Sequence, residues 1–334
     1  MSRGLSYCIV GGAGFIGGHF VERLLKAPAS ATAAVTIFDN FSSGRTEHHA
    51  HIVDARFKVV RGDAKDLPAL EAAMAGHDVV IHLASNPDIA KAMTDPTIDF
   101  YEGTLLTHNV IEAMRRTGVR KILYASGSGV YGDLGTLECQ EDQGPLLPVS
   151  TYGASKLSGE VLLCSYAHMF GIEARAFRFG NVLCPRQTHG VGFDFVNSLL
   201  RDPTRLRILG DGSQSKSYIH VEDVMDAVLL VHHEVKGPFQ VYNIATGDYI
   251  TVREIADLAL ECLGLSPAQV QFEFTGGNRG WKGDVPVVRL NTDRIQSLGW
   301  RCQSNTRTAL ARSLAAMYNE RHGERKKPAG GTPG

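Results

Sequence analysis

The stretch that decides the fold runs from Leu5 to Gly17 and reads LSYCIVGGAGFIG. Its first part, Leu5 to Val10, is a short apolar run of the kind that forms a buried parallel strand. Glycines recur at Gly11, Gly14 and Gly17, and a helical pattern of apolar residues follows. Glycines between a strand and a helix allow a tight turn and let backbone N–H groups approach an anion. The stretch therefore predicts the first unit of a doubly wound α/β fold, with a dinucleotide pyrophosphate at its turn.

Further apolar runs alternate with helical patterns through the first half of the chain, at 35–38, 57–60, 79–83 and 121–124. This alternation predicts a Rossmann-like, doubly wound parallel sheet. Another run at 174–179 closes that sheet, and the shorter pieces that follow predict a smaller mixed α/β substrate lobe. The predicted division is 1–180 for the NAD-binding Rossmann domain, which also receives roughly 237–246, then 181–322 mainly for the lobe, with 323–334 as a disordered tail.

The residues at the ends of these runs indicate which dinucleotide binds. Asp39 ends the second run, about 20 residues after Gly17, where a carboxylate accepts hydrogen bonds from ribose hydroxyls and repels a 2′-phosphate. This favours NAD over NADP, although Arg45 would soften the preference. Asp63 ends the third run and suits the adenine edge, and Ser85 lies in a turn of small residues beside the cofactor.

The segment Tyr152-Gly153-Ala154-Ser155-Lys156 supplies an acid–base group. Its tyrosine and lysine are spaced to share one face of a helix. A lysine ammonium beside a phenol favours the phenolate, so we expect the phenol pKa to fall from about 10 towards neutrality. Such a tyrosine can take a proton from a sugar hydroxyl while hydride leaves the same carbon. The fifth run delivers Ser126 and Ser128 to the same edge of the sheet.

Composition limits the partner classes. The formal net charge is −1, which indicates neither a nucleic-acid nor a membrane partner. The six cysteines form no C-x-x-C pair and predict a reduced, cytoplasmic protein. No apolar run is long enough to span a bilayer. His48, His49 and His51 crowd one loop, which is better explained as a solvated loop than as a metal site, so no metal is expected.

These motifs together resemble the extended short-chain dehydrogenases/reductases of the NDP-sugar epimerase/dehydratase family, and most of all the UDP-galactose (UDP-hexose) 4-epimerase branch. The resemblance runs from about Leu5 to Tyr318. The motifs that carry it are GGAGFIG, DNFSSGR, GDAKD, HLAS, SGSGVYG, YGASK, RFGN, GDGSQSKSYIHVEDV and GDVP. It implies NAD as cofactor, a UDP-sugar substrate, and a homodimer formed through helices around 96–116 and 152–170.

The resemblance also implies roles for individual residues. Tyr152 would be the acid/base, and Lys156 would hold the nicotinamide ribose. The cofactor contacts implied are Gly11, Gly14, Phe15, Ile16, Gly17, Asp39, Asn40, Ser43, Gly44, Asp63, Ala64, Leu83, Ala84, Ser85, Tyr152 and Lys156. The substrate contacts implied are Ser128, Asn181, Lys216, Tyr218, Arg279 and Asp284, together with Arg186 and His189, which would either meet a C6 carboxylate or cap their loop.

The chain departs from the family at several positions that bear on chemistry. The catalytic Ser or Thr of the family lies three residues before the Val of VYG, where this chain has Gly127. Ser126 and Ser128 flank it as candidate catalytic hydroxyls, and we favour Ser128. The arginine that clamps the diphosphate is Trp281 here, which leaves Arg279 or Lys282 as replacements.

Sugar dehydratases of the family carry Asp-Glu just before VYG, where this chain has Ser128 and Gly129. Neither residue can protonate a leaving hydroxyl or abstract a carbon-bound proton. Oxidation and re-reduction at C4 remain, which predicts a NAD-dependent 4-epimerase of a UDP-hexose of the UDP-glucose/UDP-galactose type. The alternatives are the same reaction on a UDP-uronate (UDP-glucuronate/UDP-galacturonate) or a UDP-N-acetylhexosamine, a net 4-keto reductase, and a non-catalytic dinucleotide sensor.

Overall fold

The main body of the protein is a seven-stranded sheet, seen in a computed structural model that describes residues 3–326. The strand order is β12-β7-β5-β4-β1-β2-β3, and every neighbouring pair is parallel. The strands are β1 Leu5–Val10, β2 Thr32–Asp39, β3 Phe57–Arg61, β4 Val79–His82, β5 Lys121–Gly127, β7 Glu173–Phe179 and β12 Phe239–Ile244. The fold is thus the Rossmann-like α/β architecture predicted from the sequence, and β12 reaches the sheet from the second half of the chain.

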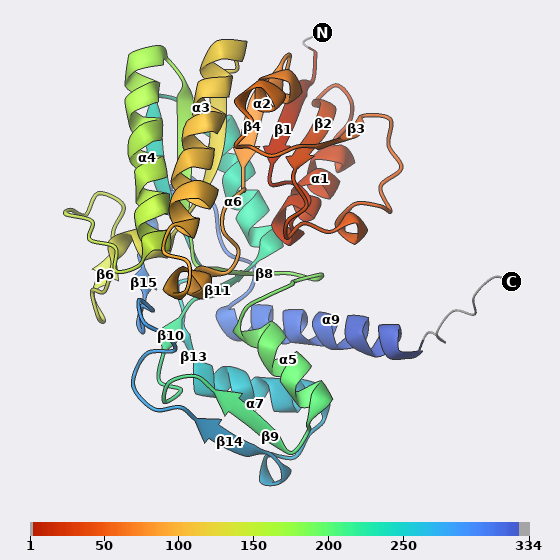
Figure 1. Ribbon diagram of the computed structural model, residues 1–334, viewed down its shortest axis with the longest axis vertical. Coiled ribbons are helices and arrows are strands. Elements are labelled where there is room, and N and C mark those ends of the chain that lie inside the picture. Colours follow the sequence, from red (N-terminus) through yellow and green to blue (C-terminus); the bar gives the residue numbers. More distant parts are fainter. Residues whose placement is uncertain (1–2, 327–334) are drawn as a thin grey trace, which may run out of the picture.

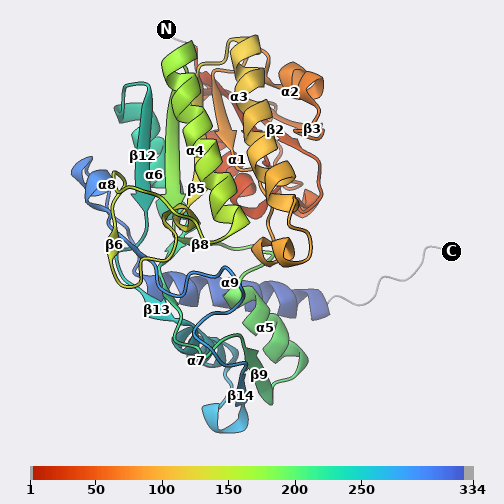
Figure 2. The same cartoon turned by 60° about the vertical axis from the view of Figure 1, so that its left-hand side comes forward.

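Helices cover both faces of this sheet (Figures 1 and 2). On one face α1 and α6 pack on the sheet in one hydrophobic core, and on the other α2, α3 and α4 form a second core. The bounds are α1 Phe15–Lys26, α2 Leu67–Met74, α3 Leu105–Thr117, α4 Thr151–Phe170 and α6 Val221–Glu234. A parallel sheet covered on both sides buries its strands, which explains their nearly continuous apolar sequence.

A smaller lobe lies at the carboxyl ends of the strands, below the sheet in Figure 1. It has a hydrophobic core of its own, built by α5 Val191–Arg201, α7 Val252–Leu263, α9 Thr306–Lys326 and the parallel pair β9 Arg205–Ile208 and β14 Gln271–Phe274. The remaining elements are short. They are β6 Glu138–Cys139, β8 Asn181–Leu183, β10 Ser215–Lys216, β11 Tyr218–His220, β13 Ile250–Thr251, β15 Arg289–Leu290, α8 Asp293–Ser297, the 3-10 turns Thr46–His48, Ile89–Met93, Ser128–Tyr131 and Pro267–Gln269, and the π-helical turn Phe100–Thr104.

The order of strands creates a crevice between the sheet and the lobe. The chain winds from β1 to β2 and β3 on one side, and from β4 to β5 and β7 on the other. Loops that leave β1 and β4 therefore diverge at the carboxyl edge, and open α/β sheets bind ligands at this switch point.

The last helix corrects one prediction. Residues 323–326 of the predicted disordered tail are helical instead, because α9 continues to Lys326. Its final residues, Glu324, Arg325 and Lys326, are good helix formers, which favours this continuation. Residues 327–334 of the predicted tail lie outside the described part of the chain.

Candidate active site

A cavity of about 1150 Å³ lies between the carboxyl edge of the sheet and the lobe. It is lined by the glycine turn after β1, the ends of β2, β4 and β5, the start of α4, and segments of the lobe around α5, β9 and β10. Most of the predicted site residues reach it. They are Gly11, Gly14, Phe15, Ile16, Gly17, Asp39, Asn40, Ser43, Asp63, Ala64, Leu83, Ala84, Ser85, Ser126, Ser128, Tyr152, Lys156, Asn181, His189, Lys216, Tyr218 and Asp284.

The glycine turn has the geometry of an anion cradle. Gly11 has φ +81°, and a Cβ there would lie 2.5 Å from the backbone nitrogen of Ala84. Gly17 lies so near Gly12 that a Cβ would be 2.4 Å from its carbonyl oxygen. Only glycine fits either position, so the first turn of α1 stays close to β1 with its N–H groups at the cavity.

The Asp39 carboxylate fixes this turn from the end of β2. It accepts hydrogen bonds from the backbone N–H groups of Ala13, at 2.9 Å, and Phe41, at 2.7 Å. Nearby, the Asn40 amide donates to Asp63 at 3.3 Å, so the ends of β2 and β3 are joined. An acid at this place has the chemistry needed to hold ribose hydroxyls.

Tyr152 and Lys156 enter the cavity from the first turns of α4. The helix begins after Ser150, whose hydroxyl accepts from the N–H of Gly153 at 3.0 Å and caps the helix. Gly153 lets the helix approach the turn after β5, since a Cβ there would lie 2.5 Å from the carbonyl oxygen of Gly129. The Lys156 ammonium donates to the Ala125 carbonyl at 2.8 Å and lies 5.6 Å from the centroid of the Tyr152 ring.

The electrostatics of this pair differ from the expectation. Burial raises the pKa of the Tyr152 phenol, and the neighbouring Ser85 hydroxyl acts in the opposite direction. Lys156 does not lower the pKa of the Tyr152 phenol as expected, because its ammonium lies 5.6 Å from the ring centroid and donates instead to the Ala125 carbonyl. Burial also lowers the pKa of Lys156 to about 8, opposed by the charge of Asp99. Both shifts have desolvation as their main cause.

Asp99 holds two segments of the site together. It is almost fully buried, and its carboxylate accepts from Asn86 at 2.8 Å and from the Thr151 hydroxyl at 2.6 Å. Thr151 is the first residue of α4, and Asn86 belongs to the loop after β4. Asp99 thus fixes the start of the Tyr152 helix against the loop that carries Ser85.

The two candidate serines have different surroundings. Ser126 is buried, and its hydroxyl donates to Glu160 at 2.5 Å. Ser128 lines the cavity, and among residues 3–326 no group forms a hydrogen bond with its hydroxyl. Gly127 between them has an extended backbone, with φ −159°, and a Cβ there would meet nothing within 4 Å. The geometry therefore leaves Ser128 available for a ligand.

On the lobe side, an ion pair joins two predicted substrate residues. The Lys216 ammonium lies 2.6 Å from a carboxylate oxygen of Asp284. The other oxygen of Asp284 accepts from the N–H of Gly280 at 3.1 Å. Tyr218 and Asn181 line the same part of the cavity, and the Asn181 amide donates to the Ser217 carbonyl at 3.2 Å.

Three predicted residues do not line the cavity. Arg186 pairs with Glu22 at 2.9 Å and donates to the His48 carbonyl at 3.0 Å, so its guanidinium is held away from the ligand space. Arg279 pairs with Asp133 at 2.5 Å. Gly44 packs against the glycine turn, where a Cβ would lie 2.7 Å from that of Ala13.

Sequence reasoning missed several cavity residues. Asp88 and Asp194 line the cavity, and burial together with the charge of Asp88 raises the pKa of Asp194. Arg207 also lines it, from a strand whose alternation buries Leu206 and Ile208. That alternation places Arg207 on the polar face of β9, but only the fold shows that this face borders the cavity.

The comparison with known proteins decides the family. Residues 7–245 match the model of the "NAD dependent epimerase/dehydratase family". This chain belongs to that family. It is 32% identical over 321 residues to the UDP-glucose 4-epimerase of Mycolicibacterium smegmatis, with 93% of this chain and 98% of the relative covered.

Two solved structures place this epimerase/dehydratase family member among enzymes of both kinds. A crystal structure of a UDP-galactose 4-epimerase is 35% identical, with a TM-score of 0.82 over 95% of this chain and 99% of the other. A dTDP-glucose 4,6-dehydratase from Streptomyces venezuelae, solved with NAD bound, is 27% identical, with a TM-score of 0.86 over 96% and 98%. The chain is thus a NAD-dependent enzyme of this family.

The residues present fit NAD as the cofactor of this family member. Gly11, Gly14 and Gly17 line the cavity without side chains, so backbone N–H groups of this turn can approach a pyrophosphate. Asp39 at the end of β2 places a negative charge where a ribose with a free 2′-hydroxyl is accepted. Within the described residues, no cluster of His, Cys, Asp and Glu is placed to hold a metal ion, and none of their helices is long and apolar enough to cross a membrane.

Proposed function

We propose that this enzyme is a NAD-dependent 4-epimerase of a UDP-hexose of the UDP-glucose/UDP-galactose type, acting through a transient 4-keto sugar. The observation that carries this proposal is the loop at the end of β5. Ser128 lines the cavity, Gly129 follows it, and neither carries the acid pair that a dehydratase of this family needs.

Each residue has a role that its position supports. Tyr152 takes the proton of the C4 hydroxyl as its phenolate and returns it as the phenol, because its side chain lines the cavity. Lys156 holds the nicotinamide ribose, and Ser128 hydrogen-bonds the sugar hydroxyl in place of the family residue missing at Gly127. When bound, NAD would supply the acceptor for the C4 hydride and its donor on the return, so no external oxidant or reductant is needed.

The lobe supports a UDP-sugar substrate. Lys216 and Asp284 line the cavity as an ion pair, whose ammonium and carboxylate suit the phosphates and the ribose of a nucleotide. The expected second cation, Arg279, is instead held by Asp133. Arg207 is a better candidate from its place on the cavity wall.

The placement of Arg186 supports a neutral sugar over a uronate. A C6 carboxylate needs a nearby cation, and the Arg186 guanidinium is already paired with Glu22. His189 does line the cavity, but its ring lies 5.1 Å from that of Phe15, and burial lowers its pKa. A UDP-N-acetylhexosamine stays an alternative, because the space beside Gly127 leaves the size of the sugar open.

The first test incubates the purified protein separately with UDP-glucose, UDP-glucuronate, UDP-N-acetylglucosamine and dTDP-glucose, without added NAD. Anion-exchange chromatography with mass detection then separates the products. A 4-epimer from UDP-glucose supports the proposal and shows that NAD is retained. A product lighter by one water, obtained from dTDP-glucose, would replace it with dehydration. Stoichiometric consumption of added NADH would indicate a reductase, and no product from any sugar would favour the sensor.

We further propose a homodimer. The π-helical turn before α3 exposes Phe100 and Tyr101, and α4 exposes Val161 and Met169, the last at 71%. Helices α3 and α4 lie side by side on the same face of the sheet (Figures 1 and 2). Exposed apolar side chains on two neighbouring helices favour a protein interface there.

Light scattering after gel filtration tests the dimer. Val161→Glu and Met169→Glu should give monomers, since each places a charge in the apolar contact. Leu137→Glu is the matched control, because Leu137 is equally exposed, at 65%, but lies on a different segment. A monomeric unmodified chain would contradict the proposal.

We also propose a division of the chain into two domains. We assign 1–180 and roughly 237–246 to the NAD-binding domain and 181–322 mainly to the substrate lobe. We also place the reaction in the cytoplasm, which agrees with the six unpaired cysteines.

A further inference from the structure

A buried ion pair lies next to residues 127–130, the loop at the end of β5 that carries Ser128, which we call the reacting loop. The Glu160 carboxylate accepts from the Arg178 guanidinium at 2.7 and 3.0 Å and from the Ser126 hydroxyl at 2.5 Å. All three side chains are at most 4% exposed. The pair is therefore fully desolvated and has a third hydrogen-bonding partner.

The three residues come from the elements that build the active site. Ser126 and Arg178 are direct partners on the neighbouring strands β5 and β7. Glu160 belongs to α4 and lies four residues after Lys156, on the same face of the helix. Ser126 itself directly precedes Gly127 and Ser128. Glu160 thus joins the strand that leads into the reacting loop to the helix that carries Tyr152 and Lys156.

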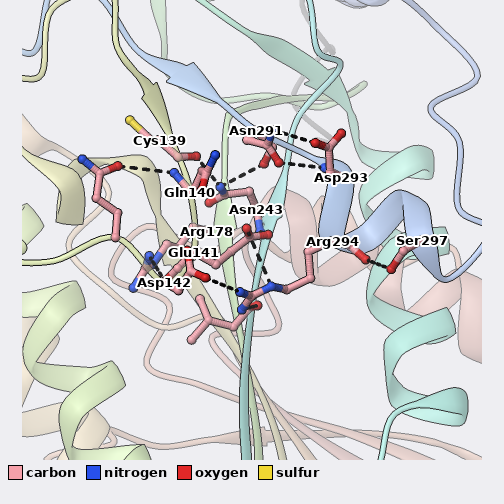
Figure 3. A network of polar contacts seen from close by, with 12 residues as sticks. Cys139, Gln140, Glu141, Asp142, Arg178, Asn243, Asn291, Asp293, Arg294 and Ser297 are labelled. Atoms are coloured by element: carbon pink, nitrogen blue, oxygen red, sulfur yellow. Dashed lines mark hydrogen bonds and ion pairs between the residues drawn. The ribbon is translucent and has the colours of Figure 1, made fainter.

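Arg178 extends the connection to the far end of the same loop. Its guanidinium lies 4.7 Å from the centroid of the Tyr131 ring and donates to the Glu141 carbonyl at 3.2 Å. The Tyr131 hydroxyl donates to Asn243 at 2.7 Å, and the Asn243 N–H donates to the Glu141 carboxylate at 2.9 Å. Figure 3 shows Arg178, Glu141 and Asn243 converging in this network. The short segment 127–130 is therefore held at both ends.

A buried ion pair is not an efficient source of stability, because desolvating two charges offsets most of their attraction. A fully satisfied polar network does, however, restrict its members to one arrangement. Hydride and proton transfer at one carbon need such a restriction, because a misplacement of about 1 Å can cost about 100-fold in rate.

We propose that Glu160 is a positioning residue, which with Ser126 and Arg178 sets the loop of Ser128 against Tyr152 and Lys156. This rests on the proposed epimerisation and assigns Ser126 to positioning instead of to contact with the sugar. Glu160 does not line the cavity, so it acts through the residues it holds.

The test is a double-mutant cycle in the full chain with Ser126→Ala, Glu160→Gln and both together. Glu160→Gln should lower kcat about 100-fold, leave KM for the UDP-sugar within about threefold, and leave bound NAD unchanged. Ser126→Ala should lower kcat less, and the double variant should be no slower than Glu160→Gln, because both changes break one unit. Ser126→Thr keeps the hydroxyl, so its kcat should stay close to that of the unmodified chain and above that of Ser126→Ala.

Hydrogen exchange of the 126–132 segment supplies a readout that does not need turnover. It should accelerate in both single variants, while exchange in α1 stays unchanged. Glu261→Gln is the matched control, because Glu261 pairs with Arg307 on the exposed surface of the lobe. Losses in kcat that multiply in the double variant, or unchanged exchange in this segment, would overturn the proposal. If the proposed epimerase function were wrong, the unmodified chain itself would convert no sugar, so that outcome differs from failure of the positioning proposal.

Discussion

The Lys156 ammonium lies 5.6 Å from the centroid of the Tyr152 ring and donates its hydrogen bond to the Ala125 carbonyl, 2.8 Å away. The two side chains share one helix face, as their spacing requires, but no hydrogen bond joins the ammonium to the phenol hydroxyl. Burial therefore dominates both groups, raising the pKa of the phenol and lowering the pKa of the amine.

Tyr152→Phe should lower the rate of C4 epimerisation by about 1000-fold, because it removes the acid–base group while keeping the ring. Anion-exchange chromatography of the UDP-sugar products measures the loss. Tyr166→Phe is the control on the same helix, since Tyr166 contacts Glu112 and not the cavity. Unchanged turnover in Tyr152→Phe would contradict the mechanism.

Lys156 should make stability depend on pH. Its pKa is lowered from 10.5 to about 8 in the folded chain, mainly by burial. Between these values the unfolded chain binds more protons than the folded one, so this lysine makes the free energy of unfolding rise with pH. Below about pH 8 both states carry the charge, and the desolvation cost is fully present.

Lys156→Met should therefore be most stabilising, relative to the unmodified chain, near neutral pH, and its advantage should shrink as pH rises through about 8 to 10.5. Urea unfolding across this range measures the difference. Lys58→Met, at an exposed lysine of the edge strand β3, should show no such trend. An advantage that is constant with pH would mean that the amine is not desolvated.

Gly127→Ser should fold normally and raise turnover. Its backbone is extended and a Cβ meets nothing within 4 Å, so the free energy of unfolding should change by no more than about 0.5 kcal/mol. The added hydroxyl should also restore part of the activity that Ser128→Ala loses, which a Gly127→Ser/Ser128→Ala double variant tests.

Gly132→Ser is the matched control for that substitution. Gly132 has φ +76°, and a Cβ there would lie 2.0 Å from the Leu147 carbonyl oxygen, so this variant should lose about 2 kcal/mol or more. Equal stability of the two serine variants would mean that the loop is not arranged as described.

Asp39→Asn should weaken NAD binding by about tenfold or more, because the carboxylate that orders the glycine turn loses its charge. It should also reduce the preference for NAD over NADP. Equilibrium dialysis of both nucleotides measures the effect. Glu47→Gln, at an exposed acid of the neighbouring 3-10 turn, should leave both affinities unchanged.

The sequence could predict those parts of the site that depend on local patterns. The Gly11 turn and Asp39 follow from a strand that runs into a glycine-rich helix start, and Tyr152 and Lys156 follow from helical spacing. The sheet itself was predictable because buried parallel strands are continuous apolar runs. Arg186 shows the limit of such reasoning, since its place in a motif did not indicate that Glu22, far away in the sequence, would hold it.

By itself, the sequence determined the doubly wound fold, the glycine turn after the first strand and the shared helix face of Tyr152 and Lys156, because strand and helix periodicity and glycine spacing act over a few residues. Only the tertiary structure decided which serine is free, since Ser126 is engaged by Glu160, 34 residues later in the chain. It also decided the direction of the pKa shifts at Tyr152 and Lys156, which depend on burial. Burial and ion pairing join elements from distant parts of the chain, and no local pattern records them.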